Sequence, residues 1–106
     1  MVYGELKVKK RYLLCRVRIS SGSITASQLY SVIMNKLCEL YGWNGKAVTS
    51  LKTWQIKDRQ NYFILKCSLR GLPYLLISTT LVNKLNNEWI AIDVLRISGT
   101  IKALLR

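Results

Sequence analysis

The longest patterned stretch of the chain, residues 7–20 (KVKKRYLLCRVRIS), predicts one β-strand with two dissimilar faces. Because side chains alternate across a strand, an apolar set lies on one face and a mixed set on the other. The apolar face holds Leu13, Cys15, Val17 and Ile19, and the mixed face holds Tyr12, Leu14, Arg16 and Arg18. Such a strand fits the middle of an antiparallel sheet with one covered and one open face. Taken alone, it leaves open whether its arginines bind a partner or are solvated.

After this strand, the chain predicts a helix with complete start and stop signals. Thr25 can act as the N-cap, Gln28 can complete a capping box, and Gly42 provides a left-handed stop. Apolar residues recur at helical spacing and form the expected buried stripe of this helix. The stripe consists of Leu29, Val32, Ile33, Leu37, Leu40 and Tyr41.

Two strands, a second helix and a last strand are expected to follow. After a turn at 43–45, residues 46–57 are expected to form an edge strand with poor alternation. A hairpin loop at 58–61 then leads into a well-patterned strand over residues 61–69. Pro73 suits the first turn of a second helix, which Asn86-Asn87 is expected to close. The last strand is expected at 88–97, before a short basic helical end at Ile101–Arg106.

This order of elements predicts an α+β fold of the ferredoxin-like (RRM-like) class, β-α-β-β-α-β. Such a fold has a four-stranded antiparallel sheet with two helices on one face, and here a short C-terminal helix is added. The first and third strands are central neighbours in this topology. Their open face is expected to hold Tyr12, Arg16, Arg18, Tyr62 and Lys66. The 106 residues are expected to form a single domain, residues 1–106, that binds RNA and other proteins.

The charge balance points to a polyanionic partner. Seventeen Lys and Arg against five Asp and Glu give a net charge of +12. In so small a domain this charge repels itself, and nucleic acid is a better candidate partner than a membrane surface. The most apolar window, residues 72–81, is about half the ~20 residues of a membrane span, and residues 1–10 hold no apolar run. We therefore expect an intracellular protein with no membrane partner.

Catalysis by the protein alone is not expected. The chain has no histidine, and its five acidic residues share no motif that would bring two carboxylates together. These residues are Glu5, Glu39, Asp58, Glu88 and Asp93, and Asp93 is best interpreted as an ion-pair partner. Cys15, Cys38 and Cys67 lack C-x-x-C spacing, so they are expected to be core thiols in a reducing compartment. The sequence thus predicts no catalytic residue, no metal site and no cofactor in the protein.

Binding is better supported than catalysis. An RRM stacks bases on aromatic residues of its two central strands, but here only Tyr12 and Tyr62 could do so. The open face is also aliphatic, which is more typical of a surface that meets a protein. The residues expected at such a protein interface are Leu14, Tyr62 and Ile64. RNA would then be contacted by edges and loops.

Two basic segments fit such RNA contacts. Residues 9–11 enter the first strand, and Arg96, Thr100 and Lys102 surround a Ser-Gly-Thr turn whose amides open the terminal helix. Amides at a helix start can hold a phosphate. The alternative for this turn is a capped helix with solvated lysines.

The same two ends carry a family resemblance. The segments KRYLLC (residues 10–15) and LRISGTIK (residues 95–102) resemble the signatures of a ribonuclease P protein subunit. This is the ferredoxin-like "processing of precursor RNA" protein, fifth of its series (the Pop-five family), which eukaryotes share with ribonuclease MRP. The middle is similar in layout, with a helix ending at Tyr41-Gly42 and Leu65-Lys66-Cys67 closing the third strand. The long acidic tail of animal members is missing, which favours an archaeal or compact eukaryotic version.

The resemblance implies a non-catalytic RNA-binding subunit of ribonuclease P. In that family the RNA, with magnesium, removes the 5′ leader of precursor tRNA. The protein pairs with a thirty-kilodalton TIM-barrel-like subunit and with a second copy or paralogue of itself. Localisation would be cytoplasmic in an archaeon, which is favoured, or nuclear and nucleolar in a eukaryote. The alternatives are a stand-alone RRM-like single-strand RNA-binding module or a ribosomal protein.

The residues expected to bind RNA come from the motif matches and from the open face. They are Lys9, Lys10, Arg11, Tyr12, Arg16, Arg18, Lys66, Arg70, Arg96, Gly99, Thr100 and Lys102. Among these, Lys66 and Arg70 fall where the family tends to keep basic residues before the second helix.

Overall fold

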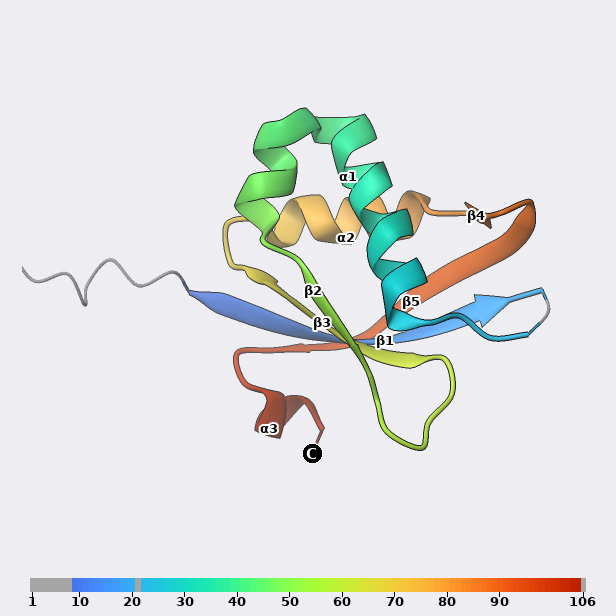
Figure 1. Ribbon diagram of the computed structural model, residues 1–106. Helices are drawn as coiled ribbons and strands as arrows, with labels where there is room; N and C mark the ends of the chain where they lie inside the picture. The colour runs from blue at the N-terminus through green and yellow to red at the C-terminus, as the bar shows by residue number, and fades with distance from the viewer. Residues whose placement is uncertain (1–8, 21, 106) are drawn as a thin grey trace, which may run out of the picture.

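The computed structural model describes residues 9–20 and 22–105, which form an antiparallel sheet flanked by helices (Figure 1). The elements are β1 (Lys10–Ile19), α1 (Ala26–Thr49), β2 (Lys52–Gln55), β3 (Tyr62–Ser68), α2 (Leu72–Leu81), β4 (Lys84–Leu85), β5 (Glu88–Ser98) and α3 (Ile101–Leu104). The strand order is β2-β3-β1-β5-β4. The predicted ferredoxin-like class and the central pairing of the first and third strands are therefore confirmed, with a fifth strand added. Lys7, Val8 and Arg106 of the predicted elements lie outside the described residues.

The central strand β1 has the two faces that its sequence predicts. It pairs antiparallel with β3, with Cys15 opposite Phe63 and Leu14 opposite Ile64. Cys15 and Phe63 are fully buried, whereas Arg16 is exposed on the other side of the strand. One face is thus committed to the core, and the other is left for polar and charged groups.

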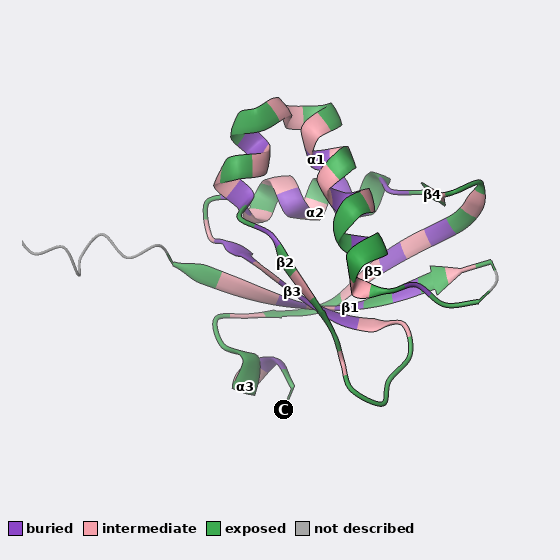
Figure 2. Cartoon of the chain, viewed as in Figure 1, coloured by how far each residue is buried: buried purple, intermediate pink, exposed green. Residues whose placement is uncertain are grey.

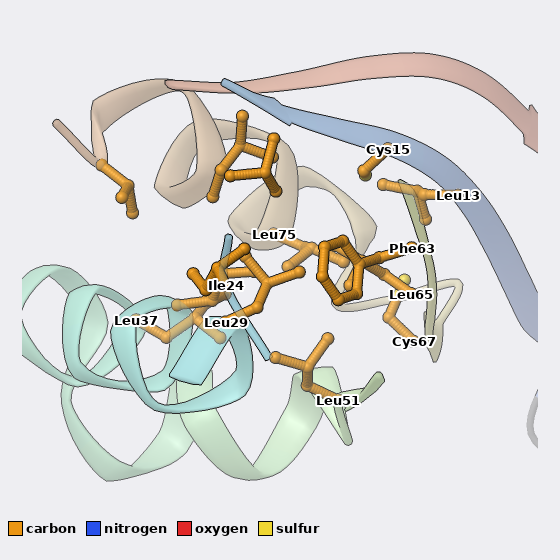
Figure 3. Packing of buried hydrophobic residues seen from close by; sticks show 14 of the residues in the cluster. Leu13, Cys15, Ile24, Leu29, Leu37, Leu51, Phe63, Leu65, Cys67 and Leu75 are labelled. Atoms are coloured by element: carbon orange, nitrogen blue, oxygen red, sulfur yellow. The ribbon is translucent and has the colours of Figure 1, made fainter. Parts of the chain in front are cut away.

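The core lies between this sheet and the two long helices, which cover the same face (Figure 1). Figure 3 shows side chains of β1, β3, α1 and α2 meeting there, and Figure 2 shows buried residues on the inner sides of both helices. The buried cluster includes Leu13, Leu29, Leu37, Phe63, Leu65 and Leu75. Complete burial of one such side chain contributes about 1.5–3 kcal/mol. This packing fixes the orientation of β1 and β3, and so fixes which side chains the opposite face presents.

Helix α1 begins as predicted, and at Gly42 it is interrupted by a kink rather than ended. The Thr25 side chain accepts a hydrogen bond from the Gln28 amide (3.1 Å), and the Gln28 side chain accepts one from the Thr25 amide (2.9 Å). Gly42 is left-handed, with φ of 69°, yet the chain resumes helical geometry and continues to Thr49. The predicted turn at 43–45 and the predicted strand start at Lys46 are therefore wrong. Leu40, in the turn before this break, is exposed, although it was expected in the buried stripe.

Residues 43–49 are helical because the fold supplies partners for them. The Thr49 hydroxyl, fully buried, donates to the Gly45 carbonyl (2.7 Å). The Ser68 hydroxyl donates to the Val48 carbonyl and accepts from the Gly71 amide. Gly71 allows this close approach, because a Cβ at that position would lie 2.4 Å from the Thr49 Cα. These contacts join segments far apart in sequence, and they restrict β2 to Lys52–Gln55.

The second helix also ends earlier than predicted. Helix α2 stops at Leu81, and Asn86 and Asn87 instead turn the chain between β4 and β5. Both asparagines have positive φ, 49° and 71°. Two consecutive positive φ values are typical of the tight two-residue hairpin turn, and asparagine tolerates them well. This hairpin supplies the fifth strand.

The short C-terminal helix α3 lies on the sheet face opposite α1 and α2 (Figure 1). It contacts β1 and β5. Leu104 is fully buried, although it is not part of the core cluster under α1 and α2. The predicted helical end is therefore confirmed, and it covers part of the face expected to be open.

Candidate nucleic-acid interface

The polar face of the sheet carries a cluster of two arginines and one carboxylate, Arg16, Arg18 and Asp93, which we call the arginine–aspartate cluster. The Arg18 Nε atom lies 2.7 Å from the Asp93 Oδ2 atom, and the Arg16 Nη2 atom lies 3.2 Å from the same oxygen. A third hydrogen bond joins Arg18 Nη2 to Asp93 Oδ1 (3.1 Å). The hydrogen bond from Arg18, and then that from Arg16, hold the pKa of Asp93 below its usual value. The interpretation of Asp93 as an ion-pair partner is thus confirmed.

Arg18 is also held from another side. Its guanidinium carbon lies 5.6 Å from the centre of the Trp89 ring, which is 52% exposed. That distance is within the range of a cation–π contact. The two arginines predicted to bind RNA are therefore ordered by groups of the protein itself.

The three residues expected at a protein interface lie together near the middle of the same face. Leu14 is opposite Ile64, and Tyr62 is opposite Arg16. Ile64 is only 8% exposed, while Leu14 and Tyr62 are half-buried. The Arg59 guanidinium carbon lies 4.3 Å from the centre of the Tyr62 ring. This contact already occupies one face of the ring, so Tyr62 is not an unoccupied platform for a base.

A second group of cations lies at the corner of the sheet where β2 begins. Lys10, Lys52 and Lys66, which we call the lysine cluster, line one hollow of about 260 Å³. The close approach of Lys10, together with loss of solvent and the charge of Lys52, lowers the pKa of Lys66. Lys52 was missed as a site residue in the sequence. Its alternation with Trp54 along β2 was the available signal, since the structure pairs these two residues with Lys66 and Ile64.

The two end segments that carry the family resemblance meet in space. Tyr12 of β1 is the register partner of Ser98 at the end of β5. A Cβ added to Gly99 would lie 3.7 Å from the Arg11 Nη1 atom, so this guanidinium reaches the turn after β5. Arg11 Nη1 also donates to the Lys10 carbonyl (2.7 Å). Segments about ninety residues apart in the chain thus form one basic end of the sheet.

The turn before α3 has the geometry of a capped helix. The Thr100 hydroxyl accepts from the Ala103 amide (3.1 Å), and the Thr100 amide donates to the Ser98 hydroxyl (3.3 Å). Arg96 Nη1 donates to the Leu104 carbonyl at the other end of α3 (3.2 Å). Lys102 is exposed on this helix. Of the two interpretations of this turn, the capped helix therefore describes its hydrogen bonds, and part of Arg96 is engaged with α3.

The remaining predicted RNA contacts lie at exposed positions. Lys9 precedes β1, and its carbonyl accepts from the Leu69 amide (2.8 Å). Arg70, the residue after Leu69, is exposed just before α2. Lys9 and Arg70 therefore belong to the same end of the sheet as the lysine cluster.

The buried thiols have raised pKa values. Burial, and then the charge of Asp93, raises the pKa of Cys15 to about 12. Burial raises the pKa of Cys67 to about 11, against a smaller lowering by Arg11. Because a thiolate is the reactive and metal-binding form, both side chains behave as apolar core groups near neutral pH.

Neither a cluster of metal-binding side chains nor a membrane-spanning helix is found in residues 9–20 and 22–105. Within them, His, Cys, Asp and Glu residues form no group of three or more that could hold a metal ion. No helix among these residues is both long and apolar enough to cross a membrane.

Comparison with known proteins identifies the family. The sequence model of the Rpp14/Pop5 family matches residues 11–106. The chain belongs to this family. The resemblance found in the two end segments is therefore confirmed, and the matched region begins at Arg11, directly after Lys9 and Lys10.

Alignments with named relatives cover nearly the whole chain. The "Ribonuclease P protein component 2" of Pyrococcus horikoshii is 33% identical over 103 residues, which cover 95% of this chain and 83% of the relative. The protein of the same name from Pyrococcus furiosus gives the same identity and coverage. That from Methanobrevibacter smithii is 29% identical over 107 residues, covering 92% of this chain and 87% of the relative.

The fold is also similar to that of a solved structure. A chain in the cryo-EM structure of yeast ribonuclease MRP aligns with a TM-score of 0.69 and 10% sequence identity. The alignment covers 89% of this chain and 76% of that chain. At this identity the likeness concerns the fold alone: a chain of very different sequence has a similar architecture.

Proposed function

We propose that this protein is a non-catalytic, RNA-binding subunit of ribonuclease P that supports the catalytic RNA in removing the 5′ leader of precursor tRNA. The observation that carries the proposal is the match of residues 11–106 to the Rpp14/Pop5 family, together with relatives named as ribonuclease P protein components. The net charge of +12 supports a role in binding RNA. The archaeal origin of these relatives supports a cytoplasmic location.

The proposed mechanism is neutralisation of phosphate charge. Each phosphate that a lysine or arginine engages releases condensed counterions, which favours binding and lets RNA helices approach one another. The basic end of the sheet, where residues 9–12 meet residues 98–102, is the proposed main contact. The bond-breaking step and the magnesium ions that it requires are assigned to the RNA.

The proposed protein partners use a different part of the surface. A thirty-kilodalton TIM-barrel-like subunit and a second copy or paralogue of this chain are proposed to contact the aliphatic middle of the polar face. Leu14, Tyr62 and Ile64 lie together there, with Leu14 and Tyr62 half-buried and Ile64 8% exposed. Apolar side chains surrounded by charged ones are typical of such interfaces.

Reconstitution tests the proposal. Catalytic RNA, the thirty-kilodalton subunit and this protein are combined with precursor tRNA at moderate magnesium, and cleavage is compared with a mixture from which only this protein is omitted. We expect omission to reduce the cleavage rate and added magnesium to restore part of it, because magnesium also neutralises phosphate. An undiminished rate without the protein would exclude the proposed role. Cleavage by the protein without RNA would exclude its non-catalytic assignment.

A further inference from the structure

Three lysines of neighbouring strands converge at one corner of the polar face. Lys52 of β2 is the register partner of Lys66 of β3. Lys66 is in turn the partner of Tyr12, which shares its strand face with Lys10 in β1. Like charges directly opposite each other on a sheet destabilise it. The fold nevertheless places three positive side chains around one point.

The three lysines surround a hollow rather than a flat surface. It has a volume of about 260 Å³ and is completed by Ser50, Cys67 and Ser68. The Ser50 hydroxyl donates to the Ala47 carbonyl, and the Ser68 hydroxyl is engaged with Val48 and Gly71. Both hydroxyls are thus engaged within the protein, and the charged residues that line this hollow are the three lysines.

The charge of this corner is not balanced within the described part of the chain. The ion pairs of the described residues join Arg16 and Arg18 to Asp93, and Lys36 to Glu39. The lysine cluster takes part in none of them. The pKa of Lys66 is lowered, first by its contact with Lys10 and further by loss of solvent and by Lys52, so the neighbouring lysines disfavour its charged form.

We propose that Lys10, Lys52 and Lys66 form a binding site for one phosphate of an RNA backbone. This site rests on the proposed function and specifies where the protein holds RNA. A phosphate bears the negative charge that the corner lacks, and its oxygens accept hydrogen bonds from several ammonium groups at once. A single anion thus relieves repulsion among three cations.

A neighbouring feature favours RNA over a free anion. Lys52 also lines a second hollow, together with the exposed aromatic residues Tyr30 and Trp54. Aromatic side chains beside a basic groove stack bases of a strand whose backbone follows the groove. The two hollows share Lys52, so an RNA strand along the edge of β2 can place a phosphate in one and a base against the other.

The first test compares two lysine variants of equal charge. Lys66→Gln removes a member of the cluster, whereas Lys84→Gln removes an exposed lysine from β4, at the opposite edge of the sheet. Affinity of the full chain for ribonuclease P RNA is measured across a salt series. We expect Lys66→Gln to lower the slope of log affinity against log salt by up to about 0.7, the value for one phosphate contact on a single strand. Lys84→Gln should change the slope by less.

Equal slopes for the wild-type protein and the Lys66→Gln variant would overturn the site, as would equal changes in the two variants. Lys52→Gln serves as a second cluster variant, with thermal unfolding of each protein as the check on folding. Because Lys66→Gln removes repulsion, we expect it to raise the thermal stability of the free protein while it weakens RNA binding. A merely structural lysine would not give these opposite effects.

The second test follows the proton on Lys66 directly. NMR of the lysine side chains gives the pKa of Lys66 in the free protein, with inorganic phosphate, and with a short polyuridine oligonucleotide. We expect the oligonucleotide to raise this pKa at a lower concentration than phosphate does. A rise with inorganic phosphate alone would assign the site to small anions, and no rise with either would remove it.

The two proposals fail in different ways. If omission of the protein abolishes precursor cleavage but Lys66→Gln binds RNA with an unchanged slope, the subunit role stands and the phosphate site falls. If the oligonucleotide raises the pKa of Lys66 but omission leaves cleavage unchanged, the site stands as an RNA contact and the ribonuclease P role falls.

Discussion

Two cationic clusters share the polar face of this sheet, and they differ in whether the protein supplies the counter-charge. In the arginine–aspartate cluster, Asp93 accepts hydrogen bonds from both guanidinium groups. In the lysine cluster, the described charged groups that act on Lys66 are Lys10 and Lys52, and they lower its pKa. The positive charge of the first cluster is balanced by its own carboxylate, whereas an external anion would relieve the repulsion among the lysines of the second. The number of basic residues therefore overestimates how many of them are available to bind a phosphate.

The largest expected effect separates the two clusters by RNA affinity. Changing Lys10, Lys52 and Lys66 together to Gln should weaken binding to ribonuclease P RNA by roughly 100-fold at low salt, since a hydrogen bond to a charged group contributes about 1.5–3 kcal/mol. Changing Arg16 and Arg18 to Gln should weaken it by much less, because both guanidinium groups already donate to Asp93. Filter binding or fluorescence anisotropy measures both. A larger loss from the arginine variant would reverse the comparison.

Removing the built-in anion should make the first cluster resemble the second. Asp93→Asn retains the shape of the side chain but leaves Arg16 and Arg18 without a carboxylate. We expect this variant to bind RNA several-fold more tightly, with a salt slope steeper by about 1–2. The same salt series measures the slope. Unchanged or weaker binding would mean that the arginines do not face RNA.

Both clusters should make stability rise with pH, but in two separate pH windows. The folded-state pKa of Asp93 is lowered, so its contribution to stability is present above its unfolded value and is lost as pH falls through the folded value. The pKa of Lys66 is lowered too, so here again the folded state loses its proton before the unfolded state does as pH rises. Stability therefore rises with pH in the alkaline window between the lowered value and the usual 10.5. Urea denaturation across pH measures both trends.

Matched variants identify the source of each trend. Asp93→Asn should flatten the acid limb and leave the alkaline limb intact, and Lys66→Gln should do the reverse. If either variant leaves its own limb as steep as in the wild-type protein, the assignment of that limb to the named residue is wrong.

The smallest expected effect concerns base stacking. A base stacked on an aromatic residue contributes ~1–3 kcal/mol. Because Arg59 already lies over the Tyr62 ring, Tyr62→Ala should lower the affinity for a short single-stranded oligonucleotide by less than about 1 kcal/mol. Isothermal titration measures the difference. A loss within the full stacking range would favour the RRM-like alternative.

Local patterns in the sequence were sufficient for much of the fold. Alternation along β1 predicts which side chains enter the core, and the Thr25–Gln28 capping box predicts the start of α1. The hairpin loop between β2 and β3 could also be predicted from the sequence, because Asp and Asn tolerate positive φ values in turns. In the structure, Asp58 and Asn61 adopt such values. Each of these features depends on residues close together in the chain.

The features that sequence analysis missed depend on distant contacts. Helical geometry at 43–49 depends on Ser68 and Gly71, and no local pattern distinguishes that segment from a strand. The lysine cluster depends on the register between β2 and β3. The alignment of Arg16 with Asp93 depends on the register of β5, which shifts at Leu95, the residue left without a partner between Val94 and Arg96. Charge pairing is therefore the part of the site that composition predicts least well.

The central claim is that this protein lends uncompensated positive charge to an RNA that performs the cleavage. The most direct measurement is the magnesium dependence of precursor tRNA cleavage by the reconstituted enzyme, with wild-type protein and with the variant in which Lys10, Lys52 and Lys66 are Gln. We predict that the variant needs more magnesium to reach the same rate and that the two rates converge at high magnesium. Coincident curves over the whole range would contradict the claim.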